Sequence, residues 1–124
     1  MCGRFSQKFT WQELHALYGI TNPAQNIEPR YNVAPTQKAW AVRFNPETKT
    51  RTLDALRWGL VPSWAQDVSI GSKMINACAE RLPIAPSFRT AFAKHRCLIP
   101  ASGFYEWKKS GAGKTPYAVV PTDS

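Results

Sequence analysis

Prolines and glycines divide this sequence into short segments, and that division constrains the fold most. The chain has 124 residues, of which 10 are Pro and 7 are Gly, and proline interrupts both helices and central strands. No apolar run approaches the roughly 20 residues that span a bilayer, and the N-terminus lacks the apolar segment of a signal peptide. Hydrophobic residues make up 44% of the chain, enough for a packed core. The length and pattern predict one folded domain built from short elements.

The clearest predicted element is a helix over Trp11–Tyr18. Thr10 and Glu13 have the spacing of a capping box, and Phe9 can pack on Leu14 as a hydrophobic staple. Gly19 can supply the left-handed residue that ends the helix. We expect His15, beside the apolar face of this helix, to be a surface or packing residue rather than a ligand.

Short strands and one more helix are expected along the rest of the chain. Residues 40–44 alternate between apolar and other side chains, and a turn at Asn45-Pro46-Glu47 leads to a second strand over residues 50–58, which predicts a hairpin. A helix is expected over residues 87–94, and strands over residues 96–99, 103–108 and 117–120. The prolines of residues 22–35 predict an irregular stretch. This pattern is typical of an α+β domain. No later element covers the last strand, so we expect the sequence to end inside a fold.

Charge and cysteine content narrow the class of protein. The chain carries 16 Lys and Arg against 8 Asp and Glu, a net charge of +8, spread evenly over both halves. Such an excess serves solubility, or nucleic-acid binding if folding gathers it on one face. Cys2, Cys78 and Cys97 form no pattern of disulfides, and His15 and His95 do not complete a zinc site. We therefore expect reduced thiols, no metal and no cofactor, as in the cytosol or the nucleus.

Cys2 is the first candidate for chemistry. Removal of Met1 would leave an α-amine and a thiol on adjacent carbons, and the amine, with an ordinary pKa of about 7.7–8.0, is partly unprotonated near neutral pH. A nearby cation such as Arg4 favours the reactive thiolate. Such an aminothiol condenses with aldehydes to a thiazolidine ring. The alternative is an inert second residue, because a lone cysteine carries no motif.

Three further positions have both a functional and a structural interpretation. Glu106 lies within a predicted strand among aromatic residues, either at a solvent-facing rim or partly desolvated and suited to proton transfer. Asn76 could cap a turn or helix, or serve as a site amide. Trp58 and Trp64 could stack on nucleic-acid bases or belong to the core.

Six motifs, taken in order, resemble those of one known family. They are Met1-Cys2-Gly3-Arg4, Arg30-Tyr31-Asn32-Val33-Ala34-Pro35-Thr36, Trp58-Gly59-Leu60-Val61-Pro62-Ser63-Trp64, Ile75-Asn76-Ala77, Arg96-Cys97-Leu98-Ile99-Pro100-Ala101 and Gly103-Phe104-Tyr105-Glu106-Trp107. They are similar to the SOS response-associated peptidase family, whose members shield abasic sites in single-stranded DNA. The resemblance implies an α+β fold whose mixed, largely antiparallel sheets form a barrel-like core with a few flanking helices. It implies that residues 1–124 are the N-terminal part of a single domain of this family, incomplete at the C-terminus.

The resemblance also implies a covalent mechanism in the DNA damage response. Met1 is removed, and Cys2 then captures the aldehyde of the ring-opened abasic sugar as a thiazolidine DNA–protein crosslink. Asn76 would hold the sugar or the N-terminal group, and Glu106 would act on the N-terminal amine as acid or base. The implied partner is single-stranded DNA containing abasic sites, with no membrane. We expect a monomer in the cytoplasm, associated with the nucleoid in a bacterium, or in the nucleus of a eukaryote.

The resemblance extends to DNA contacts, with two departures. Arg4 is expected at a phosphate, and the loop of Trp64 is expected to pack against DNA around the lesion. The family usually has an arginine that contacts DNA where this chain has Cys78, which predicts weaker or shifted DNA contact. A later histidine motif, implicated in ring opening and crosslink reversal, is absent, and neither His15 nor His95 inherits its role.

Two alternatives to a crosslinking protein remain. A truncated, catalytically impaired remnant would bind single-stranded DNA non-covalently, with steep salt dependence. A cysteine peptidase would need a base beside Cys2, and no histidine is placed by a motif for that task. The sequence allows one peptidase-like event, which is the removal of Met1. This removal would be the hydrolase-like or lyase-like chemistry of an autoprocessing protein.

Overall fold

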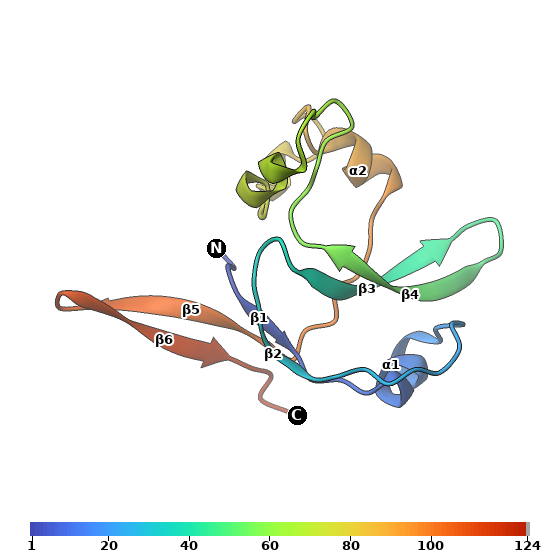
Figure 1. Cartoon of the computed structure of the whole chain (residues 1–124), viewed down its shortest axis with the longest axis horizontal. Helices are drawn as coiled ribbons and strands as arrows, with labels where there is room; N and C mark the ends of the chain where they lie inside the picture. The colour runs from blue at the N-terminus through green and yellow to red at the C-terminus, as the bar shows by residue number, and fades with distance from the viewer. Residues whose placement is uncertain (124) are drawn as a thin grey trace.

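The computed structural model describes residues 1–123 and contains two antiparallel sheets with short helices around them (Figure 1). Its elements, in chain order, are β1 (Phe5–Gln7), α1 (Trp11–Tyr18), β2 (Arg30–Val33), β3 (Lys38–Asn45), β4 (Thr50–Arg57), the 3₁₀ helices η1 (Val68–Lys73) and η2 (Ala79–Arg81), α2 (Arg89–Lys94), β5 (Gly103–Ser110) and β6 (Gly113–Val119). One sheet has the order β2-β1-β5-β6, and the other is the β3–β4 hairpin. The β5–β6 ribbon extends away from the remaining elements (Figure 1). In the described part of the chain, no helix is long and apolar enough to cross a membrane.

Helix α1 forms as the sequence predicts and covers the β3–β4 hairpin. The Thr10 hydroxyl accepts a hydrogen bond from the Glu13 amide at 3.1 Å, and Gly19 ends the helix in the left-handed region with φ 64°. Leu14 is 1% exposed and packs with Ile20, Ile27, Val42 and Leu53 in the larger core cluster. Burial of such side chains contributes about 1.5–3 kcal/mol each, so this cluster is the main stabilising contact between α1 and the hairpin.

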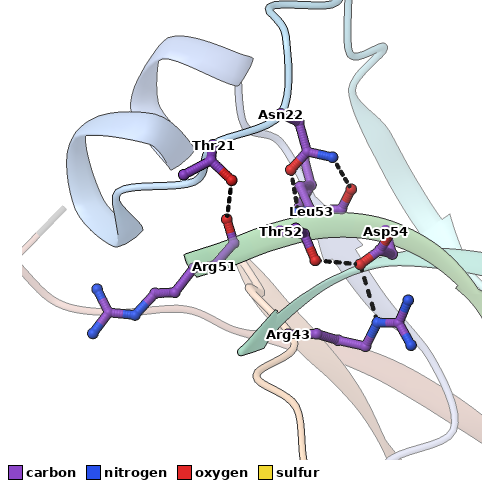
Figure 2. A network of polar contacts seen from close by, with 7 residues as sticks. All are labelled: Thr21, Asn22, Arg43, Arg51, Thr52, Leu53 and Asp54. Atoms are coloured by element: carbon purple, nitrogen blue, oxygen red, sulfur yellow. Dashed lines mark hydrogen bonds and ion pairs between the residues drawn. The ribbon is translucent and has the colours of Figure 1, made fainter. Parts of the chain in front are cut away.

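The segment after α1 is attached to β4 by an isolated bridge between Ile20 and Arg51 and by side-chain hydrogen bonds that extend it. The Asn22 side chain accepts from the Leu53 amide at 2.6 Å and donates to the Leu53 carbonyl at 3.1 Å, and Thr21 donates to the Arg51 carbonyl (Figure 2). This double contact satisfies backbone groups of an edge strand. The proline-containing segment is therefore ordered without regular structure.

Gln7 links the two sheets. Its side chain is 1% exposed, donates to the carbonyls of Trp40 and Pro100 at 2.9 and 2.8 Å, and accepts from the Trp40 amide at 3.0 Å. β1 is thus held against β3 and the segment before β5. Because Cys2 and Arg4 immediately precede β1, these contacts also fix the N-terminal residues.

Two glycines allow the loop after β4 to approach η1 closely. Gly59 has φ +122°, and a Cβ there would lie 2.3 Å from the Gly71 carbonyl oxygen. The Leu60 amide donates to the Met74 carbonyl at 3.0 Å. The backbone contact brings residues 58–61 against the segment that leads to Asn76.

The α+β class with largely antiparallel sheets is confirmed, but the expected barrel-like core is wrong for residues 1–123. β2 pairs only with β1 and β6 only with β5, so the four-stranded sheet stays open. The hairpin pairs with no strand of that sheet: Val42 forms an isolated bridge with Leu98, which lies outside the named strands, and Gln7 supplies the side-chain link between the sheets. With two free edges and a separate hairpin, the described strands do not close on themselves.

Several predicted element boundaries are also wrong. Residues 96–99 form no strand, because only Leu98 pairs with β3 and Pro100 follows. Conversely, residues 30–33 form β2, since the prolines at 29 and 35 flank the strand without entering it. The helix predicted over residues 87–94 begins only at Arg89, because Ser87 supplies no cap and Phe88 precedes the first turn. The last strand is longer than predicted and pairs with β5 along its length.

Candidate functional site

Cys2 lies beside the smaller core cluster, just before β1. This cluster contains Phe5, Val33 and Ala39, and Cys2 and Trp58 pack against it. The Phe5 and Trp58 rings meet edge to face with centroids 5.1 Å apart. Aromatic packing of this kind contributes to the stability of the cluster, and Cys2 lies against it.

A largely apolar groove of about 760 Å³ opens beside Cys2. It is lined by Cys2, Phe5, Ala39, Leu56, Arg57, Trp58, Gly59, Leu60, Val61, Ile75, Asn76, Cys97, Ile99, Ala101 and Phe104. Few of these groups are polar, and a few convergent polar groups in an apolar hollow are typical of ligand sites. Two of the predicted site residues, Cys2 and Asn76, therefore share one concave surface.

Asn76 contacts Cys2 directly. Its Nδ2 donates to the Cys2 carbonyl oxygen at 2.9 Å. The preceding residue is held by Trp58, whose indole Nε1 donates to the Ile75 carbonyl at 2.9 Å. The capping interpretation of Asn76 is not what the structure shows, because this amide spans from the loop after η1 to the N-terminal segment.

Glu106 lies beside the N-terminal amine. Its Oε1 is 3.7 Å from the Met1 nitrogen, and the Glu106 side chain is 45% exposed. Glu106 stands in β5 opposite Tyr117 of β6. The half-buried side chain is compatible with both interpretations from sequence, and a carboxylate in this position can exchange protons with an adjacent amine.

The Arg4 guanidinium contacts β2, whereas the Arg4 backbone contacts the Cys2 thiol. Its guanidinium donates to Asn32 Oδ1 at 3.1 Å, while its carbonyl accepts from the Tyr105 amide at 3.0 Å and from Cys2 Sγ at 3.6 Å. The Tyr105 hydroxyl donates to the Tyr31 carbonyl at 2.7 Å. Arg4 lines a second hollow of about 350 Å³ together with Tyr31, Asn32, Tyr105, Trp107 and Pro116. A cation beside exposed aromatic rings is a suitable surface for phosphate and base.

The other residues singled out from sequence lie apart from this arrangement or are exposed near it. Trp64 is 60% exposed and does not line the Cys2 groove. Cys78 is exposed at the start of η2. His15 stacks on Trp11 with centroids 4.8 Å apart, which confirms its packing role. His95 lines a different, basic hollow with Lys94 and Arg96.

The cysteines and the potential metal ligands are the remaining candidates for chemistry. All three cysteines are free. Burial raises the pKa of the Cys97 thiol, with a smaller opposing effect of Arg43, which keeps this groove residue protonated near neutral pH. Among residues 1–123, no group of three His, Cys, Asp or Glu side chains could hold a metal ion. The expectation of no metal and no cofactor stays a prediction.

Three further residues shape the site, and no role of their own was predicted for them from the sequence. Phe104 forms one wall of the groove, Arg57 lines it, and Asn32 holds Arg4. Asn32 lies within the motif of residues 30–36, so its position in that motif was a usable signal. Phe104 likewise lies within the motif of residues 103–107, and Arg57 directly precedes the motif of residues 58–64. Their approach to Cys2 depends on the pairing of β1 with β5 and on the packing of β4.

Comparisons with known proteins relate this chain to one family. A family model described as "SOS response associated peptidase (SRAP)" matches residues 1–124. The abasic site processing protein YoaM of Bacillus subtilis is 44% identical over 111 residues, covering 88% of this chain and 48% of that protein. The abasic site processing protein YedK of Escherichia coli is 31% identical over 133 residues, covering 99% of this chain and 55% of that protein.

A solved structure from Bacteroides thetaiotaomicron shares the fold. It superposes with a TM-score of 0.80 at 24% identity, covering 99% of this chain and 56% of that chain. The chain thus spans about half the length of the curated relatives that it matches. Because the family model matches residues 1–124, the chain belongs to the SOS response associated peptidase (SRAP) family.

Proposed function

We propose that this chain senses abasic sites in single-stranded DNA and crosslinks to them through Cys2 after Met1 is removed. The observation that carries the proposal is the convergence of two side chains on the first two residues. Asn76 donates to the Cys2 carbonyl at 2.9 Å, and Glu106 lies 3.7 Å from the Met1 amine, one residue before the amine that removal of Met1 would free. Relatives of the chain are named abasic site processing proteins. An aminothiol presented beside an amide and a carboxylate is suited to condense with the aldehyde of such a lesion.

The proposed reaction has two stages. Hydrolysis of the Met1–Cys2 peptide bond consumes one water, releases methionine and frees the Cys2 amine. That amine then adds to the aldehyde carbon and forms a C–N bond, and loss of one water gives an imine. The thiolate closes the ring by forming a C–S bond to the same carbon, and the nitrogen regains a proton. The net condensation joins amine, thiol and aldehyde and releases one water.

Each nearby residue has a defined task in this sequence. Glu106 accepts a proton from the ammonium so that the amine can attack, and returns a proton when the carbinol oxygen leaves as water. Asn76 fixes the Cys2 backbone, which limits the positions that the amine and thiol can adopt. Arg4 would bind a phosphate beside the lesion, because a guanidinium can pair with two phosphate oxygens.

The net charge of +8 supports a polyanionic partner. Chromosomal DNA as the partner would place the chain with the nucleoid in a bacterium, or in the nucleus of a eukaryote. A single-stranded substrate fits the exposed aromatic rings beside Arg4, because unpaired bases can stack on such rings. We expect the chain to act as a monomer.

The test is incubation with a single-stranded oligonucleotide that carries one abasic site, followed by a denaturing gel. We expect a shifted band with the natural chain and none with Cys2→Ala. Cys78→Ala is the matched control, because it removes an exposed thiol from the same chain. A shifted band that persists in Cys2→Ala would contradict the assignment. Retention of DNA in a native gel without any denaturing-gel shift would instead support non-covalent binding.

Glu106→Gln separates the acid–base role from a purely structural one. The amide keeps the size of the side chain and loses the ability to take a proton. We expect crosslinking to be about 10²-fold slower near neutral pH, at the lower end of the typical contribution of a general acid–base group of about 10²–10⁴-fold. An unchanged rate across pH 6–8 would remove Glu106 from the mechanism.

A further inference from the structure

We infer that Lys38, Arg57 and Arg30, at one end of the β3–β4 hairpin, bind a backbone phosphate of the strand whose lesion reaches Cys2. The inference rests on the proposed function for the identity of that strand. It assigns the strand a second anchor, on a different sheet from Arg4.

The register of the hairpin places two cations directly opposite each other. Lys38 pairs with Arg57 in β3 and β4, and residues directly opposite in an antiparallel pair project from the same face with Cβ atoms about 4.5–5.5 Å apart. Like charges in that position repel and destabilise a sheet. Both side chains are exposed. An anion lying between them would turn the repulsion into two favourable contacts.

Arg30 adds a third cation at the same end. Its guanidinium donates to the Lys38 carbonyl and, at 2.9 Å, to Gln37 Oε1. Gln37 Oε1 also accepts from the Ala34 amide at 3.0 Å. Because Arg30 is held by the backbone and by Gln37, its charge stays beside the Lys38–Arg57 pair.

Little negative charge opposes this cluster within residues 1–123. Glu28 lines a hollow with Arg30 and Lys38, and its Oε1 accepts from Asn26 at 2.9 Å. The ion pairs of the described residues join Met1 with Glu106 and Arg43 with Asp54, so none involves the cluster. Three cations against one carboxylate leave a positive surface that is suited to a phosphate.

Arg57 connects this surface to the site. It lines the groove that also contains Cys2 and Asn76. Lys38 and Arg57 lie next to Ala39 and Leu56, which line that groove from the opposite face of the hairpin. A strand with its lesion at Cys2 would therefore reach the cluster by passing around this end of the hairpin. A polynucleotide offers phosphates on both sides of a lesion, whereas free phosphate would occupy one site only, so the two sources differ in salt dependence.

The experiment measures binding of the natural chain and of Arg57→Gln, Lys38→Gln and Lys49→Gln to a fluorescent oligothymidylate without a lesion. Lys49 is the matched control, since it lies in the turn at the other end of the same hairpin. Anisotropy is followed between about 50 and 200 mM salt, because each phosphate contact adds about 0.7 to the salt slope on single strands. We expect Arg57→Gln and Lys38→Gln each to lower the slope by about 0.7 and to weaken binding severalfold at low salt. Lys49→Gln should bind like the natural chain.

Further measurements separate the effect of the charge from an effect on the structure, and separate this inference from the proposed function. Arg57→Lys should restore most of the binding lost in Arg57→Gln, because it keeps the charge, while inorganic phosphate should compete only weakly. Lys49→Gln, which lies outside both the cluster and the groove, should crosslink to abasic DNA like the natural chain. A natural chain that binds the oligothymidylate but never crosslinks would remove the proposed chemistry and leave the anchor intact. Binding and slopes of Arg57→Gln and Lys38→Gln equal to those of Lys49→Gln would overturn the inference.

Discussion

Gln7→Leu is expected to destabilise the chain more than any exposed substitution, because Gln7 joins the two sheets. The change keeps the approximate volume of the side chain and removes its amide. Three hydrogen bonds of 2.8–3.0 Å are lost, to the Trp40 carbonyl, the Trp40 amide and the Pro100 carbonyl. Gln7 is 1% exposed, so water cannot readily replace these partners.

The magnitude follows from these three bonds. A typical net contribution is about 0.5–1.5 kcal/mol per hydrogen bond, and a buried group left without a partner costs about 1–3 kcal/mol. Leucine recovers part of this loss by burying apolar surface. We therefore expect the free energy of unfolding to fall by about 3 kcal/mol, from a total that is typically about 5–15 kcal/mol for a domain.

Urea denaturation followed by tryptophan fluorescence measures this difference. With a slope of about 1.5 kcal/mol per molar urea, the loss corresponds to a midpoint about 2 M lower. Gln12→Leu is the matched control, because Gln12 is exposed on α1 and the two residues have similar helix propensity. A Gln7→Leu midpoint no lower than that of Gln12→Leu would refute the role of Gln7 as the link between the sheets.

Three further predictions concern the loop, the charge network and the DNA contact. Gly59→Ala should lower the free energy of unfolding by about 3 kcal/mol, because its Cβ would lie 2.3 Å from the Gly71 oxygen at φ +122°. Gly3→Ala is the control, since its Cβ would meet nothing within 4 Å. Equal urea midpoints for the two variants would contradict this prediction. The Arg43 hydrogen bond, partly opposed by desolvation, lowers the pKa of Asp54 (Figure 2). Its contribution, below about 1 kcal/mol for an exposed pair, should be complete above the ordinary Asp pKa of about 3.9 and be lost as pH falls through the lower folded pKa. The urea-midpoint difference between the natural chain and Asp54→Asn should shrink over that range, and a constant difference would exclude the ion pair as its source. Cys78→Arg should raise affinity for single-stranded DNA and steepen its salt slope by about 0.7, with Cys78→Gln unchanged; no gain would show that this position does not face DNA.

Local signals in the sequence were sufficient for α1 and for the β3–β4 hairpin. The Thr10 cap, Gly19 and the alternation over residues 40–44 act within a few residues, so no distant partner is needed to read them. β2 was missed because its pairing with β1 is non-local, and its flanking prolines suggested an irregular segment. Residues 96–99 carried a strand-like pattern, but only Leu98 found a partner.

The sequence was sufficient to predict which residues belong to the site, but not how these residues contact one another. Cys2 and Glu106 were distinguished by position and surroundings, and Asn76 gained its interpretation from the family resemblance. The contact of Asn76 with the Cys2 carbonyl depends on the backbone approach of Gly59 to Gly71 and on the Trp58–Ile75 hydrogen bond. Such contacts join distant segments, and no local pattern encodes them.

The most direct test of the central claim is the intact mass of the product formed with abasic single-stranded DNA. We expect the mass of this product to equal the mass of the chain without Met1 plus that of the oligonucleotide, minus one water. Borohydride should leave this product unchanged, because a thiazolidine has no imine to reduce. A product that retains Met1, or one that forms equally with Cys2→Ala, would contradict it.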